Sequence, residues 1–145
     1  MRGIYIVVLL SVFVCCDFVS SVVVVNYSDK NYVVYYSFDD SLKSSGDSLN
    51  YDYYKSFDEN KLAITEEPND YYVRGKDFGR LSFFAKDPGG LFRRSPDGKV
   101  RFFFVRDSVF FNNPWDTIVK YQMYDKKYTY SAAVMDSLDW MVEVR

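Results

Sequence analysis

Short runs of apolar and aromatic residues, interrupted every few positions by turn-forming residues, characterise the chain beyond residue 21. The clearest pattern lies at residues 48–53, where Leu49, Tyr51 and Tyr53 alternate with polar neighbours at the period of a half-buried strand. Similar runs predict strands at residues 22–27, 32–38, 61–65, 70–74 and 80–85. This spacing predicts a mainly β fold, either a β-sandwich, a partly open barrel or an antiparallel sheet, with one or two short C-terminal helices.

Two pairs of runs predict β-hairpins. Residues 22–27 and 32–38 flank the turn-like residues 28–31. Residues 91–94 and 99–106 flank Ser95-Pro96-Asp97-Gly98, in which the proline presets φ and the glycine takes a positive φ at no steric cost. Two other stretches that contain glycine, residues 77–79 and 88–90, predict plain turns.

The segment that begins at residue 113 carries signals for both a helix and a strand. Asn113-Pro114-Trp115-Asp116 supplies an N-cap, a proline at the first helical position and an acid in the first turn. The residues after it are rich in strand formers and also alternate with polar neighbours. The composition therefore favours a strand from Ile118, after at most one helical turn, that forms a hairpin with residues 127–130.

The C-terminal residues predict one helix and one strand. Val134, Leu138 and Met141 share a helical face, which favours a short helix at residues 131–138. Trp140, Val142 and Val144 then alternate as in a final strand.

The N-terminal residues have the layout of a secretory signal peptide. An arginine precedes the uncharged apolar residues 3–16, a run shorter than the ~20 residues of a membrane-spanning helix. Val19-Ser20-Ser21 fits a signal peptidase site, with residues 14–16 as a second choice and an uncleaved anchor as the alternative. We therefore expect a signal peptide at 1–21, a single β-rich domain at 22–145, secretion, and no stable membrane span after cleavage. Asn26-Tyr27-Ser28 is an N-glycosylation sequon, which makes Asn26 a candidate acceptor.

Composition excludes several classes of function. The chain has no histidine, and its two cysteines, Cys15 and Cys16, lie inside the expected signal. Histidine-dependent nucleophilic catalysis and Cys/His zinc sites are therefore absent, so we expect no enzyme, no cofactor and no metal site. The net charge of −2 and the interspersed basic residues argue against nucleic-acid binding.

Aromatic residues are the main candidates for contact with a partner. The chain has 14 tyrosines and 13 phenylalanines, and tyrosine combines a rigid apolar ring with a polar tip. Neighbouring strand residues point to opposite faces, so one tyrosine of each doublet lies at a surface unless a second layer covers it. The predicted contact residues are Tyr35, Tyr36, Tyr53, Tyr54, Tyr71 and Tyr72.

Paired carboxylates form a second candidate set. They are Asp39-Asp40, Asp58-Glu59, Glu66-Glu67, and Asp136 with Asp139. Such pairs are used in glycoside hydrolysis and in calcium binding. No stretch has the pattern of an EF-hand loop, and most of these acids adjoin turn residues, where solvated carboxylates are expected.

Two segments resemble the FAINT domain of small proteins secreted by piroplasm parasites. They are Leu49-Asn50-Tyr51-Asp52-Tyr53 and Asp97-Gly98-Lys99-Val100-Arg101-Phe102, and the resemblance covers most of residues 48–144. The aliphatic-Trp strand of that family has no counterpart, because Trp115 follows a proline and Trp140 an aspartate. The resemblance implies a secreted parasite protein that acts on its host, and it carries no catalytic residues.

The sequence therefore predicts a secreted, non-enzymatic interaction protein, an effector or surface-associated binder, that contacts a protein partner, such as a host protein, through an aromatic-rich sheet face. A carbohydrate-binding module or carboxylate glycosidase is the alternative, and a structural domain without a discrete site is a third. Aromatics aligned along a groove would favour sugar binding, two facing carboxyls would favour catalysis, and flat exposed aromatic patches would favour a protein partner.

Overall fold

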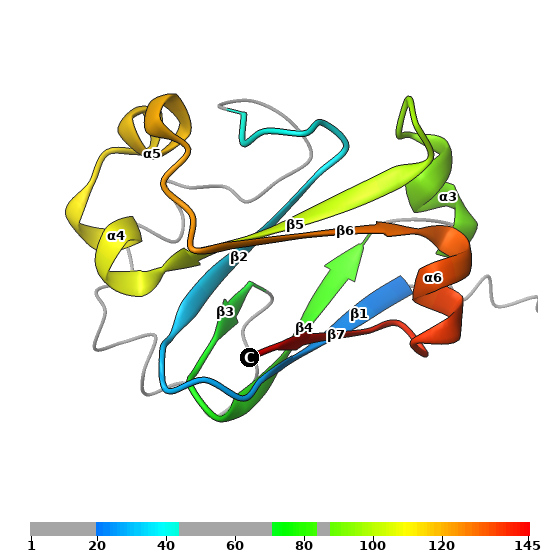
Figure 1. Ribbon diagram of the computed structural model, residues 1–145, viewed down its shortest axis with the longest axis horizontal. Coiled ribbons are helices and arrows are strands. Elements are labelled where there is room, and N and C mark those ends of the chain that lie inside the picture. The colour runs from blue at the N-terminus through cyan, green and yellow to red at the C-terminus, as the bar shows by residue number, and fades with distance from the viewer. Residues whose placement is uncertain (1–19, 44–70, 84–87) are drawn as a thin grey trace, which may run out of the picture.

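The computed structural model describes residues 20–43, 71–83 and 88–145 (Figure 1). Within these ranges the chain is mainly β, as the sequence pattern predicts, with seven strands in two open sheets and four short helices. The strands expected at residues 48–53 and 61–65 lie outside the described residues, as do residues 1–19 of the expected signal. The expected cleavage point after Ser21 falls inside the first described strand.

The smaller sheet has three strands in the order β4-β1-β7. Strand β1 (Ser20–Asn26) lies in the centre, antiparallel to β4 (Asp77–Phe83) and parallel to β7 (Met141–Val144). This sheet buries only one face, because Val22 and Val24 are fully buried while Val23 and Val25 are partly exposed.

The larger sheet has four antiparallel strands in the order β3-β2-β5-β6. They are β3 (Tyr72–Val73), β2 (Tyr32–Ser37), β5 (Lys99–Arg106) and β6 (Lys126–Ser131). The two central strands, β2 and β5, are buried along nearly their whole length.

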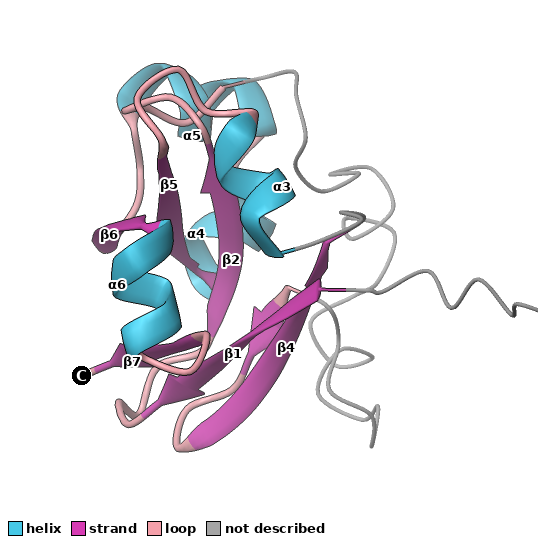
Figure 2. Ribbon diagram, turned by 90° about the vertical axis from the view of Figure 1, so that its right-hand side faces the viewer, coloured by secondary structure: helices cyan, strands magenta, loops and turns pink. Residues whose placement is uncertain are grey.

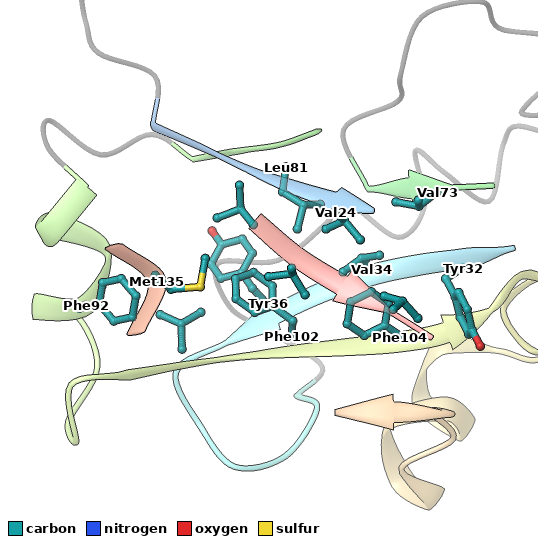
Figure 3. Close-up of a cluster of buried hydrophobic side chains, with 14 residues drawn as sticks. Val24, Tyr32, Val34, Tyr36, Val73, Leu81, Phe92, Phe102, Phe104 and Met135 are labelled. Carbon is teal, nitrogen blue, oxygen red and sulfur yellow. The ribbon is translucent and has the colours of Figure 1, made fainter. Parts of the chain in front are cut away.

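One hydrophobic core fills the space between the two sheets (Figure 3). The even-numbered residues of β2 and β5 face the smaller sheet, as the period of a strand requires. Tyr32 packs edge-to-face on Phe104 with ring centroids 5.8 Å apart. Helices α3 (Pro88–Arg93) and α6 (Ala132–Ser137) add Phe92 and Met135 to this core, and Figure 2 shows α6 beside β6 and β7.

A second core covers the opposite face of the larger sheet. Helices α4 (Asp107–Asn112) and α5 (Trp115–Tyr121) pack there against the odd-numbered residues of β2 and β5. Trp115 stacks on Tyr35 at a centroid distance of 4.4 Å and an interplanar angle of 21°. The larger sheet is therefore the middle layer of three, with apolar side chains on both faces.

The first predicted hairpin has the right strands and the wrong pairing. β1 and β2 correspond to residues 22–27 and 32–38, but each belongs to a different sheet. The segment between them passes from one layer to the other, and the Asn26 side chain fastens it to the Arg74 carbonyl in the connection between β3 and β4. The two strands therefore pair with other strands, and the turn between them, which is held by Asn26, forms a corner between the two sheets.

The second predicted hairpin is right in its turn and its second strand, and wrong in its first strand. Residues 88–93 form helix α3, so the plain turn predicted at residues 88–90 is also wrong. Pro88 suits a helix start because the first helical residues need no N–H partner. Gly98 adopts φ of +66°, as the predicted turn requires, and β5 follows it. The helix is favoured because it places Phe92 in the interlayer core.

The strand predicted from Ile118 is wrong, because residues 115–121 form α5. A helix start near residues 113–116 therefore prevails over the alternation that follows, although Pro114, not Asn113, is the N-cap residue and the helix begins at Trp115. Trp115 and Ile118 lie on one face of α5 and are buried against the larger sheet, which a strand at this point would not allow. The strand predicted at 127–130 is confirmed as β6, but it pairs with β5.

The remaining predictions have mixed outcomes. The turn predicted at residues 77–79 is wrong, because β4 begins at Asp77. Gly79 lies so close to β3 that an added Cβ would come 2.6 Å from Val73 Cγ2, so the glycine allows close packing. The helix near residues 131–138 and the final strand are confirmed as α6 and β7. Helix α4 was not predicted.

Candidate interaction surface

Three of the six predicted tyrosine contacts are core residues. Tyr35, Tyr36 and Tyr72 are 1%, 8% and 5% exposed, which corrects the expectation that they form a contact surface. The doublet at residues 35–36 does point to opposite faces, but a layer covers each face. Tyr71 is half-buried and packs against the interlayer core, and Tyr53 and Tyr54 lie outside the described residues.

The sequon residue Asn26 is a buried corner residue. Its Nδ2 donates to the carbonyl oxygens of Lys30 (2.6 Å) and Arg74 (2.9 Å). Its Oδ1 accepts from the backbone N–H (3.0 Å) and the hydroxyl (2.7 Å) of Ser28. The side chain is 1% exposed, so the folded structure has no space for a glycan on Nδ2.

Neighbouring polar groups extend this corner. Oδ1 of Asn31 accepts from the Gly75 N–H (2.9 Å), and its Nδ2 donates to Asp107 Oδ2 (2.8 Å). Gly75 lies against backbone, since an added Cβ would come 2.6 Å from the carbonyl carbon of Asp29. These bonds hold the β1–β2 and β3–β4 connections to the start of α4, so their polar groups have a structural role.

The most connected charged side chain is Arg101, on β5. Its Nη1 donates to Asp97 Oδ1 (2.8 Å) and to the Phe38 carbonyl (3.0 Å). Its Nε lies 3.6 Å from Asp40 Oδ1, and Lys127 Nζ lies 3.0 Å from the same oxygen. Hydrogen bonds from Arg101 and Ser95 hold the pKa of Asp97 well below its usual range, and Lys127 lowers the pKa of Asp40.

This network does not form the acid pair of a glycosidase. Catalysis by paired carboxyls needs one acid whose raised pKa keeps it protonated, whereas Asp40 and Asp97 are both held in the ionised form. Asp39 pairs with Lys43 (2.8 Å), and Asp136 accepts from Trp140 Nε1 (3.0 Å). In the described ranges no three His, Cys, Asp or Glu residues gather where they would hold a metal ion, and no helix has the length and apolar character to cross a membrane.

No described element lies over the outward face of the smaller sheet (Figure 2). Its strands place partly or well exposed apolar residues on that face. The strand register places these side chains in two rows across the three strands. One row consists of Arg80, Val23 and Met141, and the next of Phe78, Val25 and Glu143. Tyr27 and Arg145 continue the face beyond the strand ends. We call these eight residues the outer sheet face.

The outer sheet face contains three of the large apolar side chains that are exposed. Phe78 is 57%, Tyr27 54% and Met141 38% exposed, while the central Val23 and Val25 are partly covered by these neighbours. Aromatic and methionine side chains of this exposure are typical of protein contact surfaces rather than of a solvated sheet.

Charged side chains surround the apolar centre. Arg145 Nη2 lies 2.7 Å from Glu143 Oε2, and the Arg145 guanidinium lies 5.8 Å from the centroid of the Tyr27 ring. The exposed guanidinium of Arg80 has no hydrogen bond or ion pair in any part of the molecule that the structure describes. The face therefore offers one uncompensated positive charge beside Phe78.

Other exposed apolar side chains are more isolated. Tyr121 on α5 is 65% exposed and contacts Lys120. Val134 on α6 and Leu138 directly after it are 44% and 41% exposed, so the side that the sequence marks as apolar points outward, and Met135 is the buried residue of the helix.

Sequence reasoning did not find the outer sheet face. Residues 22–25 are four successive valines, so their hydrophobicity gives no indication of which side is buried. The only sequence pattern that could have indicated this face is the alternation of residues 78–81 in β4. Gly79 and Leu81 point into the core, whereas Phe78 and Arg80 point to the outer face. The turn prediction at residues 77–79 obscured it.

No protein-family model matches the chain, and no curated protein or solved structure matches it.

Proposed function

We propose that the chain is a secreted, non-enzymatic interaction protein that binds a protein partner through the outer sheet face. The observation that carries the proposal is the exposed Phe78 and Met141 on either side of the Val23–Val25 centre, next to Arg80, which is unpaired among the described residues. The signal-like residues 1–21 support export, and the resemblance to secreted parasite proteins supports a host protein as partner.

The chemistry of the face suits a protein partner. Covering a large apolar side chain contributes about 1.5–3 kcal/mol, and aromatic and arginine side chains are the commonest energetic centres of protein interfaces. Phe78 and Arg80 lie on β4 two residues apart and point to the same side. A partner that covers Phe78 and offers a carboxylate to Arg80 would use both.

The arrangement supports protein over sugar recognition. The exposed side chains come from three adjacent strands of one sheet and form an open face, whereas sugar-binding sites align aromatics along a groove. The low pKa values of Asp40 and Asp97 support a non-enzymatic function, because neither carboxyl is a proton donor near neutral pH.

The proposal is tested by affinity capture with the tagged protein from host-derived material. Phe78→Ser should abolish capture of any specific partner, because it removes the exposed ring at the edge of the face. Tyr121→Ser removes an equally exposed ring on α5 and should leave capture unchanged. Both variants should unfold within a few degrees of the wild type. Equal capture by the wild type and Phe78→Ser, or binding only to a glycan array, would overturn the proposal.

A further inference from the structure

Four residues occupy the corners of the outer sheet face. Arg80 and Phe78 lie on the β4 side, next to Val23 and Val25 respectively. Met141 and Glu143 lie next to the same valines on the β7 side. Arg80 and Glu143 are therefore diagonally opposite, and so are Phe78 and Met141.

This diagonal arrangement is self-complementary. A two-fold axis that lies in the plane of the face, along the diagonal from Phe78 to Met141, places a second copy face to face with the first. The operation brings the Glu143 of one copy over the Arg80 of the other, and the reverse pair forms by symmetry. Phe78 and Met141 then lie near their own counterparts at the two ends of the axis.

We infer that a second copy of this chain docks on the outer sheet face in a two-fold dimer, with Arg80 of each copy paired to Glu143 of the other. The inference rests on the proposed function, because it places a second copy of the chain on the same surface, where that copy and a host protein would exclude each other. In this dimer the apolar centre of one face covers that of the other, and the exposed Phe78 rings leave water.

The charges favour this occupant. Arg80 has no partner within the described part of the chain, and a second copy provides one. Glu143 pairs with Arg145 of its own chain, but both side chains are well exposed, at 42% and 79%, and such surface pairs exchange at little cost. The exchange also leaves Arg145 on the Tyr27 ring.

The geometry is one that sheets adopt. An axis along this diagonal makes the strands of the two copies cross steeply, close to the orthogonal class of sheet packing at about 90°. The side chains at the centre of the contact are valines, which are small enough to allow close approach.

The size of the face predicts a weak dimer. Three strands about 4.8 Å apart and about seven residues long offer a smaller surface than the roughly 800 Å² per partner of a standard interface. We therefore expect a monomer–dimer equilibrium between about 10 μM and about 1 mM.

The test is sedimentation equilibrium of the wild type and of two charge reversals, Arg80→Glu and Glu143→Arg. Each reversal alone places like charges together at both contacts and should weaken dimerisation at least about tenfold. In an equimolar mixture of the two variants every reversed charge meets its opposite, so the mixture should regain wild-type affinity. Lys120→Glu, a reversal on α5, is the matched control and should dimerise like the wild type.

Recovery in the mixture supports the two-fold contact, because a general loss of folding would not be repaired by mixing. A wild type that stays monomeric at 1 mM, or two variants that stay monomeric when mixed, overturns the dimer. If Phe78→Ser still abolishes capture of a different protein in that case, the proposed function stands without it. If capture is insensitive to Phe78→Ser as well, the proposed function fails together with the dimer.

Discussion

The Asn26 side chain joins three stretches of backbone, at residues 28, 30 and 74, and none of its polar atoms is left for solvent. A sequon is a local pattern, whereas burial depends on a carbonyl 48 residues further along the chain. The sequon predicts an exposed glycan acceptor at Asn26, whereas the side chain is buried. Nothing in the sequence indicates that the Arg74 carbonyl lies beside Asn26.

Asn26→Asp should destabilise the protein by about 2 kcal/mol or more. The carboxylate keeps the acceptor for Ser28 but cannot donate to the two carbonyl oxygens, which are then left buried without their donor. Chemical denaturation measures the loss. Ser28→Ala also removes the sequon but removes only one hydroxyl, so it should cost about 1 kcal/mol.

The same geometry predicts that the folded protein carries no N-glycan at Asn26. After expression of the protein through a eukaryotic secretory pathway, enzymatic removal of N-glycans should leave the mass of a peptide that spans residue 26 unchanged. A folded protein with a glycan at this position would contradict the corner described above.

Asp97 should make stability depend on pH in the acid range. Its pKa is held below the unfolded value of about 3.9 by hydrogen bonds from Arg101 and Ser95. A lowered folded-state pKa adds stability that is fully present above about pH 4 and is lost as the pH falls towards the folded-state value. The stability gap between the wild type and Asp97→Asn should therefore stay constant above about pH 5 and narrow below about pH 4. A gap that widens in acid would refute this account.

At the level of elements, the positions of individual helices and strands were easier to predict than the pairing of the strands. The helical spacing of Val134 and Leu138 located α6 although these side chains are exposed, and the alternation that follows located β7. The turn residues before Gly98 were sufficient for the start of β5. The pairing of β1 with β7 joins residues more than 110 positions apart, and no local pattern contains it. Helix α3 was missed because its residues include two glycines, and the burial of Phe92 outweighs their low helix propensity.

The tyrosine doublets depend on contacts that a local pattern does not contain. Alternation along a strand indicates that neighbouring tyrosines point to opposite faces, but not whether another layer covers each face. Helix α5 places Trp115 and Ile118 on Tyr35 and its neighbours. The core between the two sheets covers the other face, so Tyr36 is buried as well.

Trp115→Ala should destabilise the protein by about 3–5 kcal/mol, because it removes a buried ring that stacks on Tyr35. Trp140→Ala, a substitution of the half-buried tryptophan near α6, should cost less. Thermal or chemical unfolding of the two variants checks the order. Equal losses would indicate that α5 does not cover the sheet as described.

At the level of the whole molecule, the three layers divide the aromatic residues into two groups. The middle sheet uses its tyrosines and phenylalanines on both faces to fill two cores, without any cysteine in the described ranges. The smaller sheet is covered by described elements on one face only, and its outer face carries Tyr27, Phe78 and Met141. The expectation of an aromatic sheet face survives as a proposal, but its residues are different from those the sequence selected.

Hydroxyl-radical footprinting with mass spectrometry tests this division most directly. In dilute free protein, Tyr27, Phe78 and Met141 should be labelled as readily as Tyr121, while Tyr35, Tyr36 and Tyr72 stay protected. When the protein is concentrated or bound to its partner, Tyr27 and Phe78 should become protected and Tyr121 should not change. Rapid labelling of the three buried tyrosines, or unchanged labelling of the outer sheet face in a complex, would contradict the account.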